Sequence, residues 1–459
     1  MTTLNTDSPV LDAPPSRLKY SPRAFEAAVD IYARWEIERE KTPFDRVVGA
    51  EFRSRKYLNS GERRWVSAVL YSAVRFKQRD DFLLAKMGWE VNAENRIKLH
   101  TAEMEGTDEQ VSAAVAALPG KESRREYLRI TQSIPEAMAD ELEKILGKEA
   151  LEAGAALNQQ APITLRVNPL VVPLEKARKG LADSAFTRFS PWGLELPGRT
   201  NINDLPGFKE GWFEVQEEAS QLAVLLTDAR PGQTVVEVGS GAGGKTLALA
   251  ALIQNKGRIV ALDNSPQRME ELHKRADRAK AENIQTLLLP TNAEGVWLPE
   301  GKLEERMQKL VGNADIVLVD APCTGSGTLR RSPDTKWREM DMTALQNLQL
   351  LLLEQSAPFV KEGGCLIYVT CSFERAQNEG RINAFLKSDW GAQFEVEPAL
   401  PRLQSSLAHA AKLAGRSPKN TDIPELTNLF TGNYLRTFPH RHNLDAFFAA
   451  VLRRKLSSV

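Results

Sequence analysis

Cysteine and histidine, the residues that most often hold metals or build disulfides, are scarce in this sequence. Its 459 residues include three cysteines, Cys323, Cys365 and Cys371, and five histidines. The cysteines have no C-x-x-C spacing and the histidines are scattered, so the pattern indicates neither a metal site nor a disulfide framework. An odd, clustered set of thiols is typical of a reduced, cytoplasmic protein.

Long apolar runs are also missing. No segment approaches the roughly 20 residues that a membrane-spanning helix needs. Residues 1–10 lack the basic stretch and apolar core that mark a secretory signal. We therefore expect a cytoplasmic monomer with no membrane partner.

The chain has no net charge, with 60 Lys and Arg against 60 Asp and Glu. The charge is nevertheless unevenly distributed. Residues 17–86 hold 16 basic and 10 acidic residues, whereas residues 87–160 hold 8 and 14. A basic first segment is compatible with a polyanionic partner, and equally with a solvated helical surface, so charge alone does not choose between them.

The length and texture of the chain predict several domains. Residues 1–16, rich in proline and small polar residues, predict a disordered tail, and residues 17–155 predict a helical domain. Residues 156–212, with a strand at 163–167 and Pro/Gly-rich connections, predict a small α/β linker module. Within the helical domain we expect helices from Ser21-Pro22, over 61–78, near 107–118 and over 134–147, the last opened by a capping box from Ser133 to Glu136.

Residues 213–459 alternate apolar strands with helical segments. This alternation predicts an α/β fold of Rossmann-like type, a mostly parallel sheet with helices on both faces. Residues 402–433 contain Ser, Gly, Asn and Pro, and predict a long surface loop. We expect strands at 234–238, 258–262, 285–289, 315–319, 366–370 and 444–452, and helices at 245–254, 266–282, 339–360 and 376–386.

A glycine-rich stretch follows the first strand of this domain. Residues 235–246 read VVEVGSGAGGKT, so apolar β-formers lead into a turn and then a helix. Such a unit presents backbone N–H groups to a nucleotide or cofactor. Three patterns fit at once: a phosphate-binding G-x-x-x-x-G-K-T and a dinucleotide G-x-G-x-x-G, both from Gly239, and E-x-G-x-G-x-G from Glu237, as in S-adenosylmethionine-dependent methyltransferases.

The ends of two later strands help to choose among these patterns. One strand ends in Asp263, an acceptor placed for a ribose diol, for which a P-loop NTPase has no use. Another ends in Asp320, which would suit the metal site of a P-loop NTPase but is followed by Ala-Pro-Cys. These features favour the methyltransferase pattern and leave a P-loop NTPase and an NAD enzyme as alternatives.

Two of the three cysteines also follow strands. Cys323 and Cys371 come directly after predicted strands, whereas we interpret Cys365, at the start of a strand, as a buried apolar residue. Carbon 5 of cytosine is a poor nucleophile, and a thiolate that adds to carbon 6 enables it to attack a methyl donor. Because a free thiol has a pKa of about 8.5, we expect the site to favour the thiolate.

These motifs resemble those of the bacterial Sun/Fmu-type RNA (cytosine-5)-methyltransferases, which modify small-subunit ribosomal RNA. The helical residues 17–155 resemble, more weakly, the NusB-like RNA-binding domain of that family. The resemblance rests on FKEGWFEVQEEASQ at 208–221, the cofactor loop, Asp263, DAPCTGSG at 320–327, RRSPDTKW at 330–337, YVTCS at 368–372, FPHRH at 438–442 and Phe447-Phe448.

The resemblance implies methyl transfer from S-adenosylmethionine to carbon 5 of a cytosine in RNA, with 16S ribosomal RNA as the expected substrate. Cys371 is then the nucleophile, Cys323 assists release of the RNA, and Asp320 contacts both the cofactor region and the target cytosine. The residues implied to bind S-adenosylmethionine are Gly239, Ser240, Gly241, Ala242, Gly243, Gly244, Lys245, Asp263, Asn292 and Asp320.

Two positions depart from the family pattern. The loop at 239–245 lacks the proline of the usual Cys-Ala-Ala-Pro-Gly-Gly-Lys, which alters its stiffness. Asn292 stands where an Asp is usual, although an amide can both accept and donate. A P-loop ATPase and a catalytically degenerate RNA-binding ribosome-assembly factor stay open as alternatives. The segment from Arg330 to Trp337 is expected either to contact RNA or to form a surface turn.

Overall fold

The structure is a computed structural model, and it describes residues 21–106, 108–198, 200–416 and 424–457. The chain forms two compact units. Unit 1 comprises residues 1–161 and 325–340, and unit 2 comprises residues 162–324 and 341–459. The tail expected at 1–16 lies outside the described residues, and the four-part division expected from the sequence stays a prediction.

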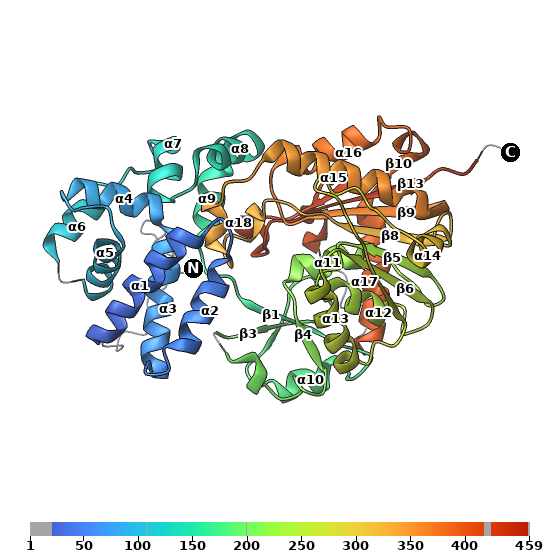
Figure 1. The fold of residues 1–459 in the computed structure, drawn as a ribbon, viewed down its shortest axis with the longest axis horizontal. Helices are drawn as coiled ribbons and strands as arrows, with labels where there is room; N and C mark the ends of the chain where they lie inside the picture. Colours follow the sequence, from blue (N-terminus) through green and yellow to red (C-terminus); the bar gives the residue numbers. More distant parts are fainter. Residues whose placement is uncertain (1–20, 107, 199, 417–423, 458–459) are drawn as a thin grey trace. The chain divides into compact units, whose positions relative to one another are not determined.

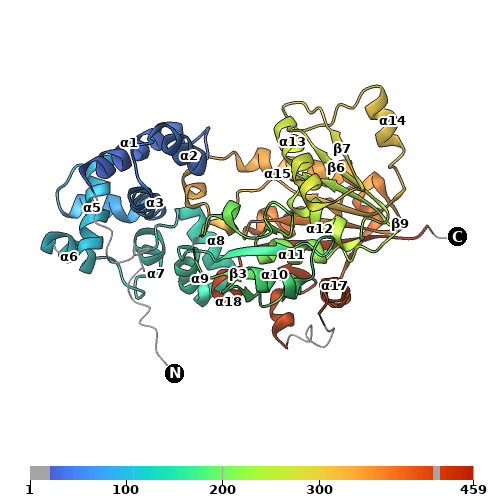
Figure 2. The same ribbon diagram turned by 90° about the horizontal axis from the view of Figure 1, so that it is seen from below.

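Unit 1 is helical, as expected. Its longest helices, α1 (Pro22–Glu38), α3 (Ser60–Arg75) and α5 (Ala93–Glu105), lie side by side around a common apolar cluster (Figures 1 and 2). Ser21 caps α1 as predicted, because its hydroxyl accepts a hydrogen bond from the N–H of Ala24. The other helices are α2 (Phe44–Ser54), α4 (Lys77–Lys86), α6 (Glu109–Ala116), α7 (Arg124–Glu126), α8 (Glu136–Leu146) and α9 (Ala150–Leu157).

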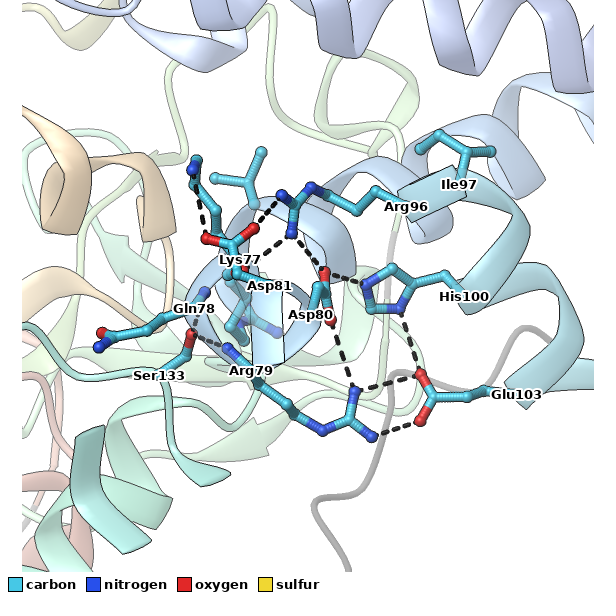
Figure 3. A network of polar contacts seen from close by, with 12 residues as sticks. Lys77, Gln78, Arg79, Asp80, Asp81, Arg96, Ile97, His100, Glu103 and Ser133 are labelled. Carbon is cyan, nitrogen blue, oxygen red and sulfur yellow. Dashed lines mark hydrogen bonds and ion pairs between the residues drawn. The ribbon is translucent and has the colours of Figure 1, made fainter. Parts of the chain in front are cut away.

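A buried polar network joins α4 to α5 (Figure 3). His100 Nε2 lies 2.8 Å from Asp80 Oδ2, and both side chains are fully buried. Arg79 donates to the Glu103 carboxylate, and Arg96 lies 3.4 Å from Asp80. Buried charges are tolerated only when they are paired in this way, so the network restricts how the two helices can pack.

The capping box predicted from Ser133 to Glu136 is wrong. The residue that precedes α8 is Pro135, which has no side chain able to cap the helix. Ser133 has a φ of 52°, and its hydroxyl accepts hydrogen bonds from the N–H groups of Gln78 and Arg79 at 2.8 and 3.1 Å. The Ser133 hydroxyl therefore satisfies the first turn of α4 instead of its own helix.

The segment 325–340 belongs to unit 1 although it lies between two elements of unit 2 in the chain. Lys336 is 5% exposed, and its ammonium donates to the carbonyls of Arg75 and Ser133, both at 3.1 Å, and to Asn158 Oδ1 at 2.6 Å. The indole of Trp337 donates to the carbonyl of Val74 at 2.6 Å. The surface turn expected here is wrong at Lys336, which is buried within unit 1, and contact of the segment with RNA stays a prediction.

Unit 2 is built on a nine-stranded sheet in the order β11-β12-β13-β9-β8-β5-β6-β7, with β10 paired to β13. The five strands from β9 to β7 in this order are parallel, and the remaining pairings are antiparallel, which confirms a mostly parallel Rossmann-like core. The strands are β5 (Thr234–Val238), β6 (Arg258–Asp263), β7 (Ile284–Leu288), β8 (Ala314–Asp320), β9 (Val360–Thr370), β10 (Phe394–Glu397), β11 (Phe430–Thr431), β12 (Tyr434–Arg436) and β13 (Phe448–Arg454).

Helices cover both faces of this sheet (Figure 1). Alternate strand residues enter two apolar clusters, with Val235 in one and Val236 in the other, as the two-residue period of a strand requires. One face packs against α11 (Glu218–Leu225), α12 (Gly244–Leu252) and α17 (Ala399–Leu413), and the other against α14 (Lys302–Gln308), α15 (Met342–Ser356) and α16 (Glu379–Phe385). Helix α13 (Pro266–Ala279) packs through Leu272 and Ala276 beside β6.

A second, antiparallel sheet precedes this core. Its four strands have the order β2-β3-β1-β4, and the strand expected at 163–167 is confirmed as β1. A short helix, α10 (Leu174–Gly180), follows β1. The strands are β1 (Ile163–Val167), β2 (Ala185–Phe186), β3 (Gly193–Leu196) and β4 (Phe213–Val215).

Three local predictions in unit 2 are wrong. The long loop expected at 402–433 is wrong over residues 402–413, because Leu403, Leu407 and Ala410 recur at helical spacing and bury one face of α17; residues 417–423 lie outside the described residues. The helix expected at 339–360 ends at Ser356, close to Pro358, and β9 begins at Val360. The last strand starts at Phe448 rather than at 444. Among the described residues, no helix combines the length and hydrophobicity needed to cross a membrane.

We expect Lys336→Met to destabilise the full-length protein, because it leaves three buried oxygens without their donor. The free energy of unfolding should fall by roughly 2–4 kcal/mol, measured by urea denaturation followed by circular dichroism. The exposed Lys41 is a matched control, and Lys41→Met should change the value by less than about 0.5 kcal/mol. Equal effects of the two variants would contradict the anchoring role of Lys336.

Candidate active site

The candidate site lies at the carboxyl ends of the parallel strands. Strand β5 lies between β6 and β8, so the chain runs outward from β5 in one direction and returns on its other side at β8. This change of direction is a topological switch point, where open α/β sheets bind their ligands. The glycine-rich loop follows β5, Cys323 follows β8 and Cys371 follows β9.

The loop at 239–244 needs its glycines. Gly239 has a φ of 77°, and a Cβ atom there would lie 2.5 Å from the carbonyl oxygen of Asp320. Gly243 has a φ of 87°, and a Cβ atom there would lie 2.8 Å from Leu272 Cγ. The loop therefore passes close to the end of β8 and opens helix α12, whose first N–H groups suit an anionic or polar ligand.

Two arginines outside the loop hold its backbone. Arg275 of α13 donates to the carbonyl of Ala242 at 2.8 Å and pairs with Glu214 at 2.8 Å. Arg166 of β1 donates to the carbonyl of Gly244 at 2.6 Å and is almost fully buried. Sequence patterns missed both residues, because they come from other elements and carry no motif. They give the loop a fixed path although it lacks proline.

The structure brings Asp263 to this loop. Its carboxylate accepts from the N–H groups of Gly241 at 2.8 Å and Ser265 at 2.9 Å, and the side chain is 3% exposed. Asn292, four residues beyond the end of β7, has an exposed side chain. Its Oδ1 accepts from the N–H of Glu294 at 3.1 Å and so shapes its own turn. Asn292 stays a prediction as a cofactor contact.

Three ionisable residues lie at the base of the loop. Lys245 Nζ lies 2.6 Å from Asp320 Oδ2, which ties the start of α12 to the end of β8. Glu237 lies fully buried in β5. Burial raises the pKa of Glu237 to about 8, and the neighbouring carboxylates of Asp320 and Asp263 add to this increase. Glu237 is therefore mainly protonated at neutral pH.

The two strand-end cysteines meet. Cys323 Sγ lies 3.3 Å from Cys371 Sγ, and both side chains are half-buried. Cys365 is buried in β9 away from this pair, as expected. The hydrogen bond between the two thiols and burial raise the pKa of Cys371 well above its usual range, and Lys245 only partly opposes them. This direction is opposite to the one that we expected for a nucleophile, and its main cause is the second thiol.

A group of buried amides and hydroxyls surrounds the residues next to these thiols. Gln377 binds Thr324 and Ser372, which follow Cys323 and Cys371 in the chain, and Gln349 binds the carbonyl of Pro322. None of these residues was predicted. Of these residues, Gln349 is the one that a sequence pattern could have identified, since it is a polar residue on the apolar face of the leucine-rich segment that forms α15.

Comparison with known proteins identifies the family. The family described as "16S rRNA methyltransferase RsmB/F" matches residues 224–453. The chain is 33% identical over 334 residues to "Probable ribosomal RNA small subunit methyltransferase B" of Synechocystis sp., covering 70% of this chain and 67% of that protein. The chain belongs to the RsmB/F family of 16S rRNA methyltransferases. The expected resemblance to Sun/Fmu-type enzymes is thereby confirmed.

Solved structures share the fold of this chain. A methyltransferase homolog protein from Pyrococcus horikoshii is 28% identical with a TM-score of 0.54, and the match covers 72% of this chain and 98% of that one. The crystal structure of PH0851 superimposes with a TM-score of 0.71 at 24% identity, over 95% of this chain and 99% of that one. The second likeness shows the fold, and it extends over nearly the whole chain.

We expect Glu237→Gln to flatten the dependence of stability on pH. A carboxyl whose pKa is about 8 in the folded protein and near 4.5 when unfolded loses stability as pH rises through that window. For the unmodified protein this loss is on the order of 3 kcal/mol between pH 5 and 8, and the amide variant should lack it. Urea denaturation at both pH values measures the difference, and parallel pH dependence in the two proteins would contradict the assignment.

We expect Cys323→Ala to lower the pKa of Cys371, because it removes the largest contribution to the increase. The rate of alkylation of Cys371 by iodoacetamide, measured by peptide mass spectrometry across pH, should reach its midpoint at lower pH in the variant. Cys365→Ala is the matched control and should leave the profile unchanged. A profile for Cys323→Ala that coincides with the control would refute the coupling between the thiols.

Proposed function

We propose that this protein transfers a methyl group from S-adenosylmethionine to carbon 5 of a cytosine in 16S ribosomal RNA, through a covalent bond between Cys371 and carbon 6. The observation that carries the proposal is the pair of thiols, Cys323 and Cys371, 3.3 Å apart at the switch-point edge of the sheet. Methylation of an exocyclic amine would need no thiol, whereas carbon 5 needs covalent activation.

The roles of the two thiols follow from this chemistry. Cys371, as a thiolate, forms a bond to carbon 6, and the electron pair displaced from the ring makes carbon 5 nucleophilic. Carbon 5 then takes the methyl group. Cys323, as a thiolate, takes the proton from carbon 5, and the electron pair of that C–H bond restores the ring double bond and expels the Cys371 thiolate. Cys323 is the group next to Cys371 that can assist this last step. Asp320, at the end of β8, is the proposed contact for the cytosine and the cofactor.

The raised pKa of Cys371 requires that substrate binding lower this pKa before the thiolate attacks. Lys245 is the cation whose charge lowers the pKa of Cys371, and it is paired with Asp320. A cytosine that draws Asp320 away would free Lys245 to favour the Cys371 thiolate. Activation of the nucleophile is thus linked to substrate binding rather than built into the pair of thiols.

The residues around the loop fit S-adenosylmethionine, which supplies the methyl group when bound. Gly239 and Gly243 keep the loop open where a Cβ atom would clash. The Ser240 hydroxyl is buried without a hydrogen bond among the described residues, and a polar ligand would satisfy it. The acid at the end of β6, Asp263, suits a ribose diol. Gly241, Ala242, Gly244, Lys245 and Asn292 complete the proposed contacts.

The two alternatives carried from the sequence have less support. A P-loop ATPase uses the lysine of its loop to bind phosphates, whereas Lys245 is paired with Asp320. A degenerate assembly factor would not need both thiols to meet at the strand ends. Titration calorimetry with S-adenosylmethionine separates these proposals from ours, because neither alternative predicts binding.

We expect Cys371→Ala to abolish methyl transfer to 16S ribosomal RNA, because the variant cannot activate carbon 5. Cys323→Ala should instead accumulate RNA bound covalently to the protein, seen as a band that survives denaturing electrophoresis. Bisulfite-type mapping of 5-methylcytosine in ribosomal RNA, with and without the gene, identifies the modified nucleotide.

Cys365→Ala is the control for loss of a thiol, and it should retain activity and show no trapped RNA. Full methyl-transfer activity of Cys371→Ala would contradict the proposed mechanism. A Cys323→Ala variant that turns over normally and traps nothing would remove the release role from Cys323 alone.

A further inference from the structure

A single buried amide binds the residues that follow both active-site thiols. Gln377, fully buried just before α16, accepts from the Thr324 N–H at 2.9 Å through its Oε1. Its Nε2 donates to Thr324 Oγ1 at 3.0 Å and to Ser372 Oγ at 3.2 Å. Because Thr324 follows Cys323 and Ser372 follows Cys371, one side chain bridges the two loops.

Other groups fix Gln377 itself. Gln349 Nε2 donates to Gln377 Oε1 at 3.1 Å and to the carbonyl of Pro322 at 2.8 Å. The Tyr368 hydroxyl, from β9, donates to the Gln377 carbonyl at 2.7 Å. The amide thus has little freedom to rotate, and its donor and acceptor ends are both defined.

The Glu374 carboxylate completes this hydrogen-bond network. Glu374 Oε2 accepts from Thr324 Oγ1 at 2.7 Å and from Ser372 Oγ at 3.0 Å, so it receives the hydroxyl protons of both loops. With those protons directed at Glu374, the two hydroxyl oxygens are available as acceptors for Gln377 Nε2. All of these hydrogen bonds can form together only when the two loops keep their present spacing.

We propose that Gln377 is a positioning residue that sets the spacing between the Cys323 and Cys371 thiols. The inference rests on the proposed function only for its effect on turnover, because the spacing itself can be measured without RNA. The role differs from that of a catalytic residue, since Gln377 reaches the reacting atoms only through Thr324 and Ser372. In the proposed mechanism, release of the methylated RNA from Cys371 depends on Cys323 lying beside Cys371. A looser spacing of the thiols should therefore slow release of the RNA more than the attack of Cys371 on carbon 6.

The first test measures the spacing. Diamide oxidises two thiols to a disulfide and is itself reduced to the hydrazine, so its rate of reaction with the full-length protein reports how the sulfurs are held. In Gln377→Met, which keeps the volume and loses the polar contacts, we expect the Cys323–Cys371 disulfide to form at least about tenfold more slowly. Gln377→Glu, which keeps the acceptor, should lie between this variant and the unmodified protein.

Gln308→Met is the matched control, because Gln308 is exposed on α14. It should react with diamide at the unmodified rate. If Gln377→Met does not fold, the intermediate rate of Gln377→Glu still tests the proposal. Rates equal to the control in both Gln377 variants would overturn it.

The second test measures turnover with RNA. Gln377→Met should accumulate trapped RNA at steady state, and its kcat and KM for RNA should fall together while kcat/KM changes little, because the slowed step follows attack. A general loss of folded protein would lower the apparent kcat without trapping RNA. If Cys371→Ala retains full methyl-transfer activity while the diamide rates still respond to Gln377, the proposed function fails and the positioning role stands. Trapping by Cys323→Ala but not by Gln377→Met, with unchanged diamide rates, overturns the positioning role alone.

Discussion

The parallel pairing of β8 with both β5 and β9 is the constraint on which the candidate site depends. It places the segments that follow three strands at one edge of the sheet: the glycine loop after β5, Cys323 after β8 and Cys371 after β9. The apolar side chains of these strands enter clusters on both faces, so a shift in register would be costly. The distance between the thiols is therefore set first by the core and only then refined by hydrogen bonds.

Hydrogen bonds from residues outside the sequence motifs then fix the glycine loop and the two thiol loops. Arg166 and Arg275 hold the carbonyls of the cofactor loop, and this supplies from neighbouring elements the rigidity that a proline would give from within. Gln377 does the equivalent for the thiol loops. In both places the proposed site residues belong to the motifs, and residues outside the motifs determine their geometry.

The sequence predicted what depends on local pattern. Strands β5, β6, β7 and β8 were placed within a residue or two, because each is a short apolar run between turn signals. Helix α17 was missed because its serines outweighed the spacing of Leu403 and Leu407. The contact of Gln377 with Thr324 could not be predicted, because the two residues are 53 positions apart and leave no local pattern. The direction of the Cys371 pKa shift depends on the distance to Cys323, which no sequence motif contains.

The path of the chain through residues 325–340 bears on how such a protein can be assembled from parts. This segment follows the Cys323 loop directly and yet completes the helical unit, where Lys336 and Trp337 bind backbone carbonyls of α3. Neither unit is a contiguous stretch of sequence, so recombination at a single point cannot exchange one without damaging the other. An exchange of the helical unit would therefore need junctions on both sides of residues 325–340 as well as one after residue 161.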